Sequence, residues 1–352
     1  REHLFAYDTI KTTENIDSRT LQTTLNSYLH YAINTNHQIR TGITVSHYYL
    51  DFKADNYDTN TKLRDFTGHT MNIQVHAQWL FNISRRLKLN LGVNGQSLLL
   101  NNSIGISPRL AFSWQVLASH KLSVGYGWNH QMQPWEIYLN RSQEASNFGE
   151  MADINLGFNQ NHHVSLTYDW AIINNLRLRL EGYFQYMYNI PVKTDVPNIS
   201  LFNLSSSQNL LEMTNFNSSG VARSYGAELT LEKFFSDGYY ALLTATYFDV
   251  MYLDDLGLWR NTESNNQFAG DLLFGKEFKI GKKKNNRLFI DVTYSFRMGN
   301  FYTPVNLSAS QAANTQVLDW DKAYTLRHPN FHNVDLRSIQ IFKDFIGKIA
   351  AK

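Results

Sequence analysis

Three charged side chains stand at alternate positions of residues 175–192, NLRLRLEGYFQYMYNIPV. Alternate residues of a β-strand point to the same face, so Arg177, Arg179 and Glu181 would share one polar face. The opposite face would be apolar, with aromatic rings gathered toward the C-terminal end. Charged groups arranged in this way can pair with one another, hold water or contact another protein. We therefore expect the strand to be one element of a polar, water-lined wall.

Charged residues fall on the equivalent face of later predicted strands. Two interpretations are open for the set: contact with another protein segment, or cross-strand charge pairing that only keeps a lumen wet. The residues predicted to point into the lumen are Arg177, Arg179, Glu181, Glu228, Glu232, Asp291 and Arg297.

Catalytic and metal-binding patterns are weak. The chain has no G-x-S-x-G, P-loop or G-x-G-x-x-G motif. Its 12 histidines include the adjacent His162 and His163, but none has the spacing of a metal site on a helix. His163 and Ser165 lie two residues apart, as chance allows in this composition. We predict no enzyme activity, no metal and no cofactor.

Aromatic residues in the expected loops are the candidates for binding a ligand that arrives from outside. Aromatic faces suit sugar rings and iron chelates alike. The alternative is that these rings lie in an interfacial belt or pack the loops together. The candidates are Trp135, Tyr138, Trp259, Tyr302, Trp320 and Tyr324.

Period-two alternation recurs along the whole chain and predicts about fourteen strands. The cleanest covers residues 71–82, with Met71, Ile73 and Val75 on one face and Asn72 and Gln74 on the other. The expected strands lie near residues 3–13, 21–33, 39–49, 71–82, 87–94, 110–116, 122–128, 164–170, 176–192, 224–232, 241–247, 268–278, 288–296 and 334–341.

The predicted connections alternate between short and long. Short turns include residues 34–37, 84–86 and the hairpin signal Ser236-Asp237-Gly238. Long loops are expected at residues 53–68, 131–161, 193–220, 254–264 and 299–330, and 101–107 is the one short connection on that side. Short turns at one end and long loops at the other are typical of outer-membrane barrels.

Bulk composition agrees with this class. Hydrophobic residues make up 43% and aromatic residues 14% of 352 residues, and the mean hydropathy is −0.37. A barrel has such values because only every second strand residue faces lipid. The formal charge of +2 indicates no nucleic-acid partner, and the absence of cysteine excludes disulfides. No run is long and apolar enough for a transmembrane helix.

Several segments, in order, resemble one family. They are GVARSYGAELTLEKFFSDGYYALLTATYFD (residues 220–249), WRNTESNNQFAGDLLFGKEF (259–278), LEGYFQYMYNIPV (180–192), VGYGWNHQMQPWEIY (124–138), FYTPVNLSAS (301–310) and HNVDLRS (332–338). The chain resembles the C-terminal barrel of TonB-dependent outer-membrane receptors, in the branch common in Bacteroidetes-type bacteria. Residues 1–120 are assigned by strand pattern alone.

The resemblance implies an all-β, transmembrane antiparallel β-barrel, of which this chain would supply about fourteen of 22 strands. It implies an outer-membrane location in a Gram-negative cell and a plug domain that fills the lumen, which we expect to be absent from this chain. We expect residues 1–344 to be an incomplete barrel and residues 345–352 an atypical tail. The chain starts at Arg1 without a leader, so we expect a fragment.

The implied function is the barrel of an active importer for a large, scarce solute: a siderophore, cobalamin, a glycan or a peptide. Its partners would be outer-membrane lipid, the receptor's own plug, the energy-coupling protein of the inner membrane and, as a further option, a surface lipoprotein. The lumenal set would then touch the plug. The alternatives are a passive porin-like channel and a structural or adhesive barrel.

Overall fold

The computed structural model describes residues 2–4, 10–12, 14–57, 60–141, 150–194, 199–203, 213–281 and 284–341. The tail predicted at residues 345–352 lies outside this part of the chain. Within it, no helix is both long and apolar enough to cross a membrane.

One antiparallel sheet of fourteen strands dominates the structure. Its neighbours follow chain order, apart from β13, which pairs only with β12. The long strands are β3 (Glu14–Ala32), β4 (His37–Asn56), β5 (Thr61–Asn82), β6 (Leu87–Leu98), β7 (Ser103–Leu117), β8 (His120–Gln131), β9 (Asn159–Ile173), β10 (Leu176–Lys193), β11 (Phe216–Ser236), β12 (Tyr239–Leu253), β14 (Phe268–Ile280), β15 (Asn286–Arg297) and β18 (Phe331–Ile341), and β13 (Trp259–Asn261) is the short one. The prediction of about fourteen strands in an antiparallel sheet is confirmed.

The prediction that residues 3–13 form the first strand of the large sheet is wrong. Residues 3–13 were expected to form a barrel strand, but they contribute β1 (Glu2–Leu4) and β2 (Ile10–Thr12), which pair with each other in a separate two-stranded sheet. The fourteenth member of the large sheet is instead β13.

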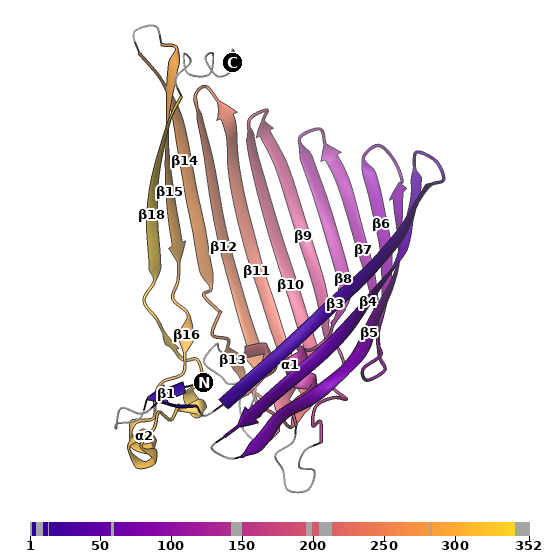
Figure 1. Cartoon of the computed structure of the whole chain (residues 1–352). Coiled ribbons are helices and arrows are strands. Elements are labelled where there is room, and N and C mark those ends of the chain that lie inside the picture. Colours follow the sequence, from indigo (N-terminus) through magenta and orange to yellow (C-terminus); the bar gives the residue numbers. More distant parts are fainter. Residues whose placement is uncertain are drawn as a thin grey trace, which may run out of the picture.

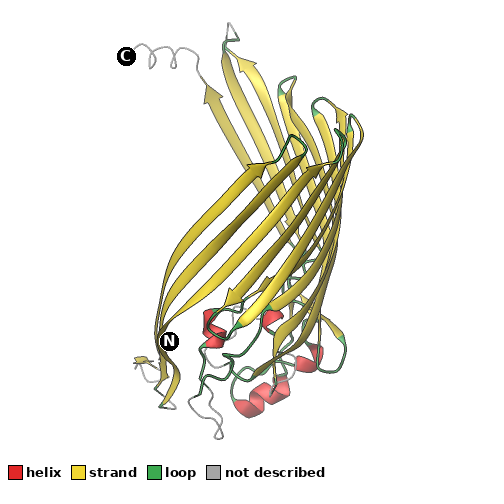
Figure 2. Cartoon of the chain, turned by 90° about the vertical axis from the view of Figure 1, so that its right-hand side faces the viewer, coloured by secondary structure: helices red, strands yellow, loops and turns green. Residues whose placement is uncertain are grey.

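The sheet curls around a hollow, so that β3, β4 and β5 pass in front of the strands from the middle of the chain (Figure 1). Figure 2, a view from the side, shows the same curvature. The sheet does not close: β3 and β18 are its two edges, and each pairs with a single neighbour. We call its inner side the concave face and its outer side the convex face.

The two ends of the sheet differ as predicted. At one end, which we call the turn end, strands are joined by tight turns. An example is Asp237-Gly238 between β11 and β12, where φ is 55° and 79° as a type I′ hairpin turn requires. At the other, the loop end, the connections carry α1 (Trp135–Tyr138), α2 (Leu307–Ala313), the 3₁₀ helices η1 (Leu201–Asn203) and η3 (Trp320–Lys322), and β16 (Phe301–Tyr302) paired with β17 (Leu326–Arg327).

The prediction of a long loop at residues 53–68 is wrong. β4 continues to Asn56 and β5 begins at Thr61, so most of this polar stretch is strand. β4 and β5 have 20 and 22 residues, whereas a tilted strand needs about 9–11 to cross a membrane. Both strands therefore extend well beyond the thickness of a bilayer at the loop end.

Candidate functional site

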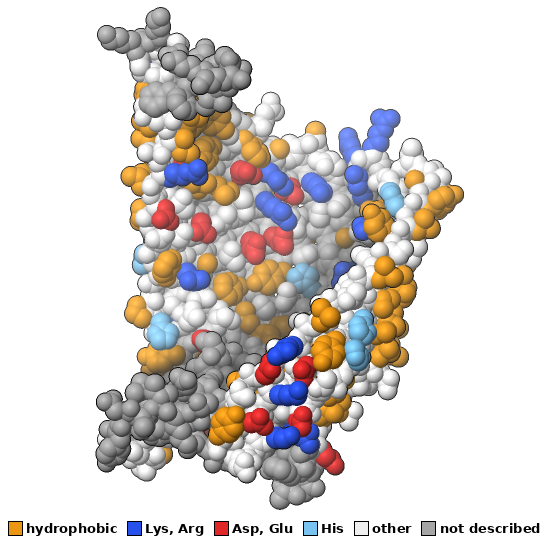
Figure 3. Space-filling view, in the orientation of Figure 1, with side chains coloured by type: hydrophobic (Ala, Val, Ile, Leu, Met, Phe, Trp, Pro, Cys, Tyr) orange, Lys and Arg blue, Asp and Glu red, His pale blue; other side chains and the backbone are white. Residues whose placement is uncertain are grey.

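The concave face is polar over most of the sheet. Charged side chains gather on it over the middle and C-terminal strands (Figure 3). The strand register puts Arg177 opposite Glu232, and Glu181 opposite Glu228, on one face of β10 and β11. Asp291 on β15 lies opposite Gly275 on β14 and Arg337 on β18. The structure thus brings the predicted lumenal residues together on a common wall.

Three of these residues are held by local pairing. Arg177 Nε donates to Asp169 on β9 at 3.0 Å, and Arg179 donates to Glu181 at 2.8 Å. Glu181 also accepts a hydrogen bond from Thr167 at 3.0 Å. The Arg177 and Arg179 side chains remain 43% and 47% exposed. Exposed pairs of this kind add little to stability, so their main effect is to keep the wall hydrated.

Asp291 and Arg297 have other partners. Tyr240 Oη donates to Asp291 at 2.8 Å, and the Arg297 guanidinium lies over the Phe331 ring, 5.4 Å from its centroid. These two residues and Glu228 and Glu232 face the same hollow as the arginines. Contact of this set with a plug stays a prediction.

The convex face is apolar between the turn end and a sharp boundary. Leu25 on β3, Val75 on β5 and Leu166 on β9 are 71%, 52% and 50% exposed on this face. In water such a broad apolar surface would be costly, but lipid would cover it. Aromatic rings with a polar atom mark the boundary at the loop end: Tyr126 and Tyr188 stack on His162, and the Tyr188 hydroxyl donates to Gln160 at 2.6 Å.

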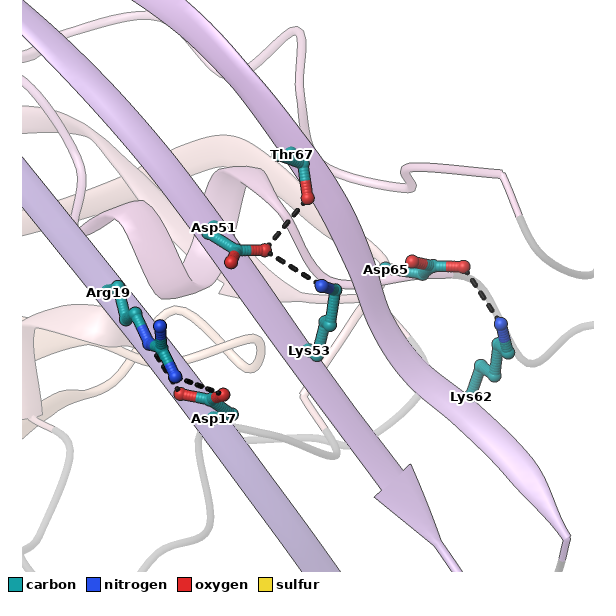
Figure 4. Close-up of polar contacts among 7 residues, drawn as sticks. All are labelled: Asp17, Arg19, Asp51, Lys53, Lys62, Asp65 and Thr67. Atoms are coloured by element: carbon teal, nitrogen blue, oxygen red, sulfur yellow. Dashed lines mark hydrogen bonds and ion pairs between the residues drawn. The ribbon is translucent and has the colours of Figure 1, made fainter.

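Beyond that boundary the polarity of β3, β4 and β5 reverses. Their convex face now carries a charge ladder, the residues Asp17, Arg19, Asp51, Lys53, Lys62 and Asp65 with Thr67 beside them (Figure 4). Arg19 pairs with Asp17 at 3.2 Å, Lys53 with Asp51 at 3.2 Å and Lys62 with Asp65 at 2.9 Å. The hydrogen bond that Thr67 donates at 2.8 Å is the main cause that lowers the pKa of Asp51.

The concave face of the same segment is apolar instead. Leu50, Phe52 and Ala54 alternate with the charge ladder and are at most 2% exposed. Leu50 and Phe52 share one core with the loop between β8 and β9, which folds into the space inside the sheet and buries Ile137 and Leu139 completely, and Ala54 packs with Leu63. At the loop end, water therefore lies outside the wall and a protein core lies inside it.

Two predicted ligand-binding aromatics, Trp135 and Tyr138, belong to that core. Trp135 contacts the edge of the Tyr48 ring at 4.9 Å between centroids. Tyr138 is fully buried, and its hydroxyl accepts a hydrogen bond from the Gln133 backbone at 3.1 Å. Burial raises the pKa of the Tyr138 hydroxyl. This placement matches loop packing, the alternative open for these rings.

Three others come together around a second cluster at the loop end. Trp320 packs against a core that contains Tyr324, and Trp259 and Tyr324 line a groove of about 290 Å³. Tyr324 is 5% exposed, and burial raises its pKa to about 12. The Arg223 guanidinium stacks on Trp259 at 4.1 Å. Trp259 is thus half-buried beside the groove, and Tyr324 forms the floor.

Tyr302 stands apart from both clusters. It lies on β16 and stacks on His328 with ring centroids 4.5 Å apart, and it is 36% exposed. The structure therefore divides the six aromatics between two buried clusters and one exposed stack.

A family model settles the family of this fold. The model described as "TonB dependent receptor-like, beta-barrel" matches residues 2–345. The chain belongs to the TonB-dependent receptors. It is accordingly an outer-membrane β-barrel protein, with lipid on its convex face.

Solved TonB-dependent receptors share the fold at low sequence identity. The ferripyoverdine receptor of the outer membrane of Pseudomonas aeruginosa is 15% identical with a TM-score of 0.64, and the match covers 92% of this chain and 43% of that one. The ferric yersiniabactin uptake receptor of Yersinia pestis is 10% identical with a TM-score of 0.61, and the match covers 92% of this chain and 47% of that one. The FrpB iron transporter of Neisseria meningitidis is 11% identical with a TM-score of 0.62, and the match covers 91% of this chain and 48% of that one. The chain thus spans less than half the length of these receptors.

No curated protein sequence matches the chain. The Bacteroidetes-type branch therefore stays a prediction, carried by the sequence segments alone.

Sequence reasoning missed the residues that fasten the inward loop of this receptor barrel. Arg64 on β5 is 3% exposed and donates from Nε to Asn140 at 2.7 Å, and Asn140 donates to the Met213 carbonyl at 2.9 Å. Asp153 accepts a hydrogen bond from the Phe216 backbone at 2.8 Å. These contacts join segments more than 60 residues apart, so no local pattern marks them.

The region between Asp65 and Glu136 is unusual in its charge composition. Residues 66–135 contain no Asp or Glu, although they contain five Lys or Arg. In the structure this segment builds most of β5 and all of β6, β7 and β8. Within the described chain, a concave hollow of about 620 Å³ lies on these strands and β9.

Proposed function

We propose that the chain forms the wall of an energised importer that brings a large, scarce solute across the outer membrane. The observation that carries this proposal is the polar concave face between the turn end and the loop-end core, which is backed by a lipid-facing convex face. A wall with this polarity suits a hydrated passage. Membership of the TonB-dependent receptor family supports the same function. We propose no catalytic role, in keeping with a family and fold of transporters.

The solute classes that this proposal covers are siderophores, cobalamin, glycans and peptides. Among the similar structures, two are of receptors for ferripyoverdine and ferric yersiniabactin, and one is of a copper transporter. These names support uptake of a metal chelate as one candidate. The half-buried Trp259 and the exposed Tyr302 are the rings that we propose as contacts for the arriving solute, with Trp135 and Trp320 supporting the loops that present them.

The proposed partners complete the transport cycle. A plug domain would occupy part of the space that the curled sheet encloses and contact the lumenal set from Arg177 to Arg297, and the inner-membrane coupling protein would act on that plug. A surface lipoprotein is a further proposed partner at the loop end.

Uptake in cells that carry the complete receptor tests this function. Four radiolabelled probes represent the classes: a ferric siderophore, cobalamin, an oligosaccharide and an oligopeptide. We expect one of them to accumulate above its external concentration, and this accumulation to stop when the coupling protein is deleted or a protonophore is added. Entry that only follows the concentration gradient and survives both treatments would indicate the passive porin instead.

A further inference from the structure

The hollow on β5–β9 has two glycines in the middle of its floor. The register sets five residues in one row across the sheet: Gln78, Gly92, Arg109, Gly127 and His163. Arg109 therefore stands between two glycines that face the same side. A Cβ added at Gly92 would meet nothing nearer than 3.7 Å, so the space beside Arg109 is open.

Carboxamide side chains and the histidines His76 and His163 supply hydrogen-bonding groups to the rest of the lining, which also includes apolar residues such as Val93 and Ala111. Gln78 donates to Asn90 at 2.9 Å, and Arg109 donates to the Asn129 carbonyl oxygen at 3.0 Å. Each carboxamide has both donors and acceptors, so most of this capacity remains for water or a solute. Such a surface matches oxygen-rich molecules, whose hydroxyl, carbonyl and carboxylate groups need several partners at once.

The charge of the hollow differs from that of the wall beyond it. No acidic residue occurs in residues 66–135. Among the described residues that line the hollow there is no Lys, Asp or Glu, and Arg109 is the one arginine. On β11 and β14, by contrast, Glu228, Glu232 and Asp271 surround Thr244 on the concave face. Charges in a recessed site attract ions of opposite sign, so the two parts of the wall should treat ions differently.

We propose that the hollow beside Arg109 is a transit site for oxygen-rich solutes that are neutral or anionic, and that it disfavours cations. This inference rests on the proposed import function and narrows its solute class. A competing use of the glycine floor is close approach of a protein segment, such as the plug backbone, which would fill the same space.

Thiol labelling of the complete receptor in outer membranes tests the site, because this chain has no cysteine of its own. Gly92→Cys places a thiol on the floor. Its reaction rate is measured with an anionic reagent, sulfonatoethyl methanethiosulfonate, and a cationic one, trimethylammonioethyl methanethiosulfonate. For each reagent, the rate at the cysteine is divided by the rate of the same reagent with free mercaptoethanol. This normalisation removes the difference in intrinsic reactivity between the two reagents.

The expected result is a preference of about threefold to tenfold for the anionic reagent at Gly92→Cys, as one charge within several ångströms would produce in a wet site. Adding Arg109→Gln should abolish this preference. Thr244→Cys should show the opposite preference. Gly95→Cys is the matched control: it is on the same strand but faces lipid, its added Cβ meets nothing nearer than 3.9 Å, and it should react with neither reagent.

Two results would overturn the proposal. An unreactive Gly92→Cys thiol, in a receptor whose Thr244→Cys thiol reacts, would mean that protein fills the hollow. Equal normalised rates with the two reagents would remove the charge selection. Labelling needs no energy coupling, so a failure of energised uptake would contradict the proposed function without changing these rates.

Discussion

Asp153 is enclosed at the loop end, where its side chain is 2% exposed. One carboxylate oxygen accepts the Phe216 N–H, and burial raises the pKa of Asp153 to about 6 from the ordinary 3.8. Between about pH 4 and pH 6, Asp153 therefore holds a proton in the folded loop that it has lost in the unfolded loop. Because the folded pKa is the higher one, loop stability is greatest below about pH 4 and falls as the pH rises to about 6.

The first prediction concerns this carboxyl group. A shift of about two pKa units corresponds to about 3 kcal/mol of loop stability lost across that pH range. Asp153→Asn keeps an acceptor for Phe216 and removes the charge, so we expect its loop to be equally protected from about pH 4 to 7.5. Hydrogen exchange of the peptides that contain Phe216, corrected for the intrinsic pH dependence, measures this protection.

The control is Asp237→Asn in the exposed turn at the far end of the sheet. It should leave the pH dependence of the Phe216 region as it is in the unmodified protein. Equal pH dependence in Asp153→Asn and the unmodified chain would contradict the role of Asp153.

At the scale of the strand, adjacent residues meet different solvents. Val75 on β5 is 52% exposed on the convex face, and its neighbour Gln74 points into the concave hollow. We expect Val75→Arg to cost about 2–4 kcal/mol, the range for arginine at the middle of a bilayer, and Gln74→Arg to cost little. The measure is the fraction of receptor that assembles in the outer membrane and keeps its folded mobility on unheated gels.

This pair changes one charge at neighbouring positions of the same strand, so strand propensity and overall charge are matched. If both variants assembled equally well, the convex face of β5 would not face lipid.

The strands show what alternation alone could predict. Residues 71–82 were predicted as a strand because apolar and polar residues alternate there. One face contacts lipid and the other contacts water, so no other segment of the chain is needed to cover either face. Residues 53–68 were predicted as a loop because the charges of Lys53, Asp55 and Asp65 dominate the stretch. On its apolar face, Phe66 packs against the cluster that contains Ile137 and Leu139, which are about 70 residues away, and a sequence pattern does not show such a cover.

The candidate site follows the same rule. The charges on β10 and β11 could be assigned to one face because a single strand period fixes it. The burial of Tyr138 and Tyr324 could not, since it depends on how loops from different parts of the chain pack together.

For the whole molecule, the decisive feature is the open sheet. Among the residues that the structure describes, β3 and β18 each leave one row of backbone N–H and C=O groups without a strand partner. Such groups cannot be satisfied in lipid, where every spanning sheet must close. We therefore expect the 352-residue chain, refolded alone into planar bilayers, to give no conductance in discrete, channel-sized steps.

A complete receptor barrel refolded in the same way serves as the positive control for the assay. Regular unitary steps from this chain alone would show that the two edges find partners, either each other or a second copy.

The central claim is that the sheet is a membrane wall whose polarity reverses at the loop end, and a cysteine scan along β5 tests it most directly. Single cysteines from residue 64 to residue 81 are labelled with a membrane-impermeant maleimide in the complete receptor, after permeabilisation that admits the reagent from both sides. From Ile73 to Phe81 the account predicts labelling at even positions only. At Asp65 and Thr67 it predicts labelling of the odd positions, with Arg64 and Phe66 protected. Labelling without alternation, or alternation without the reversal near Gly68, would contradict it.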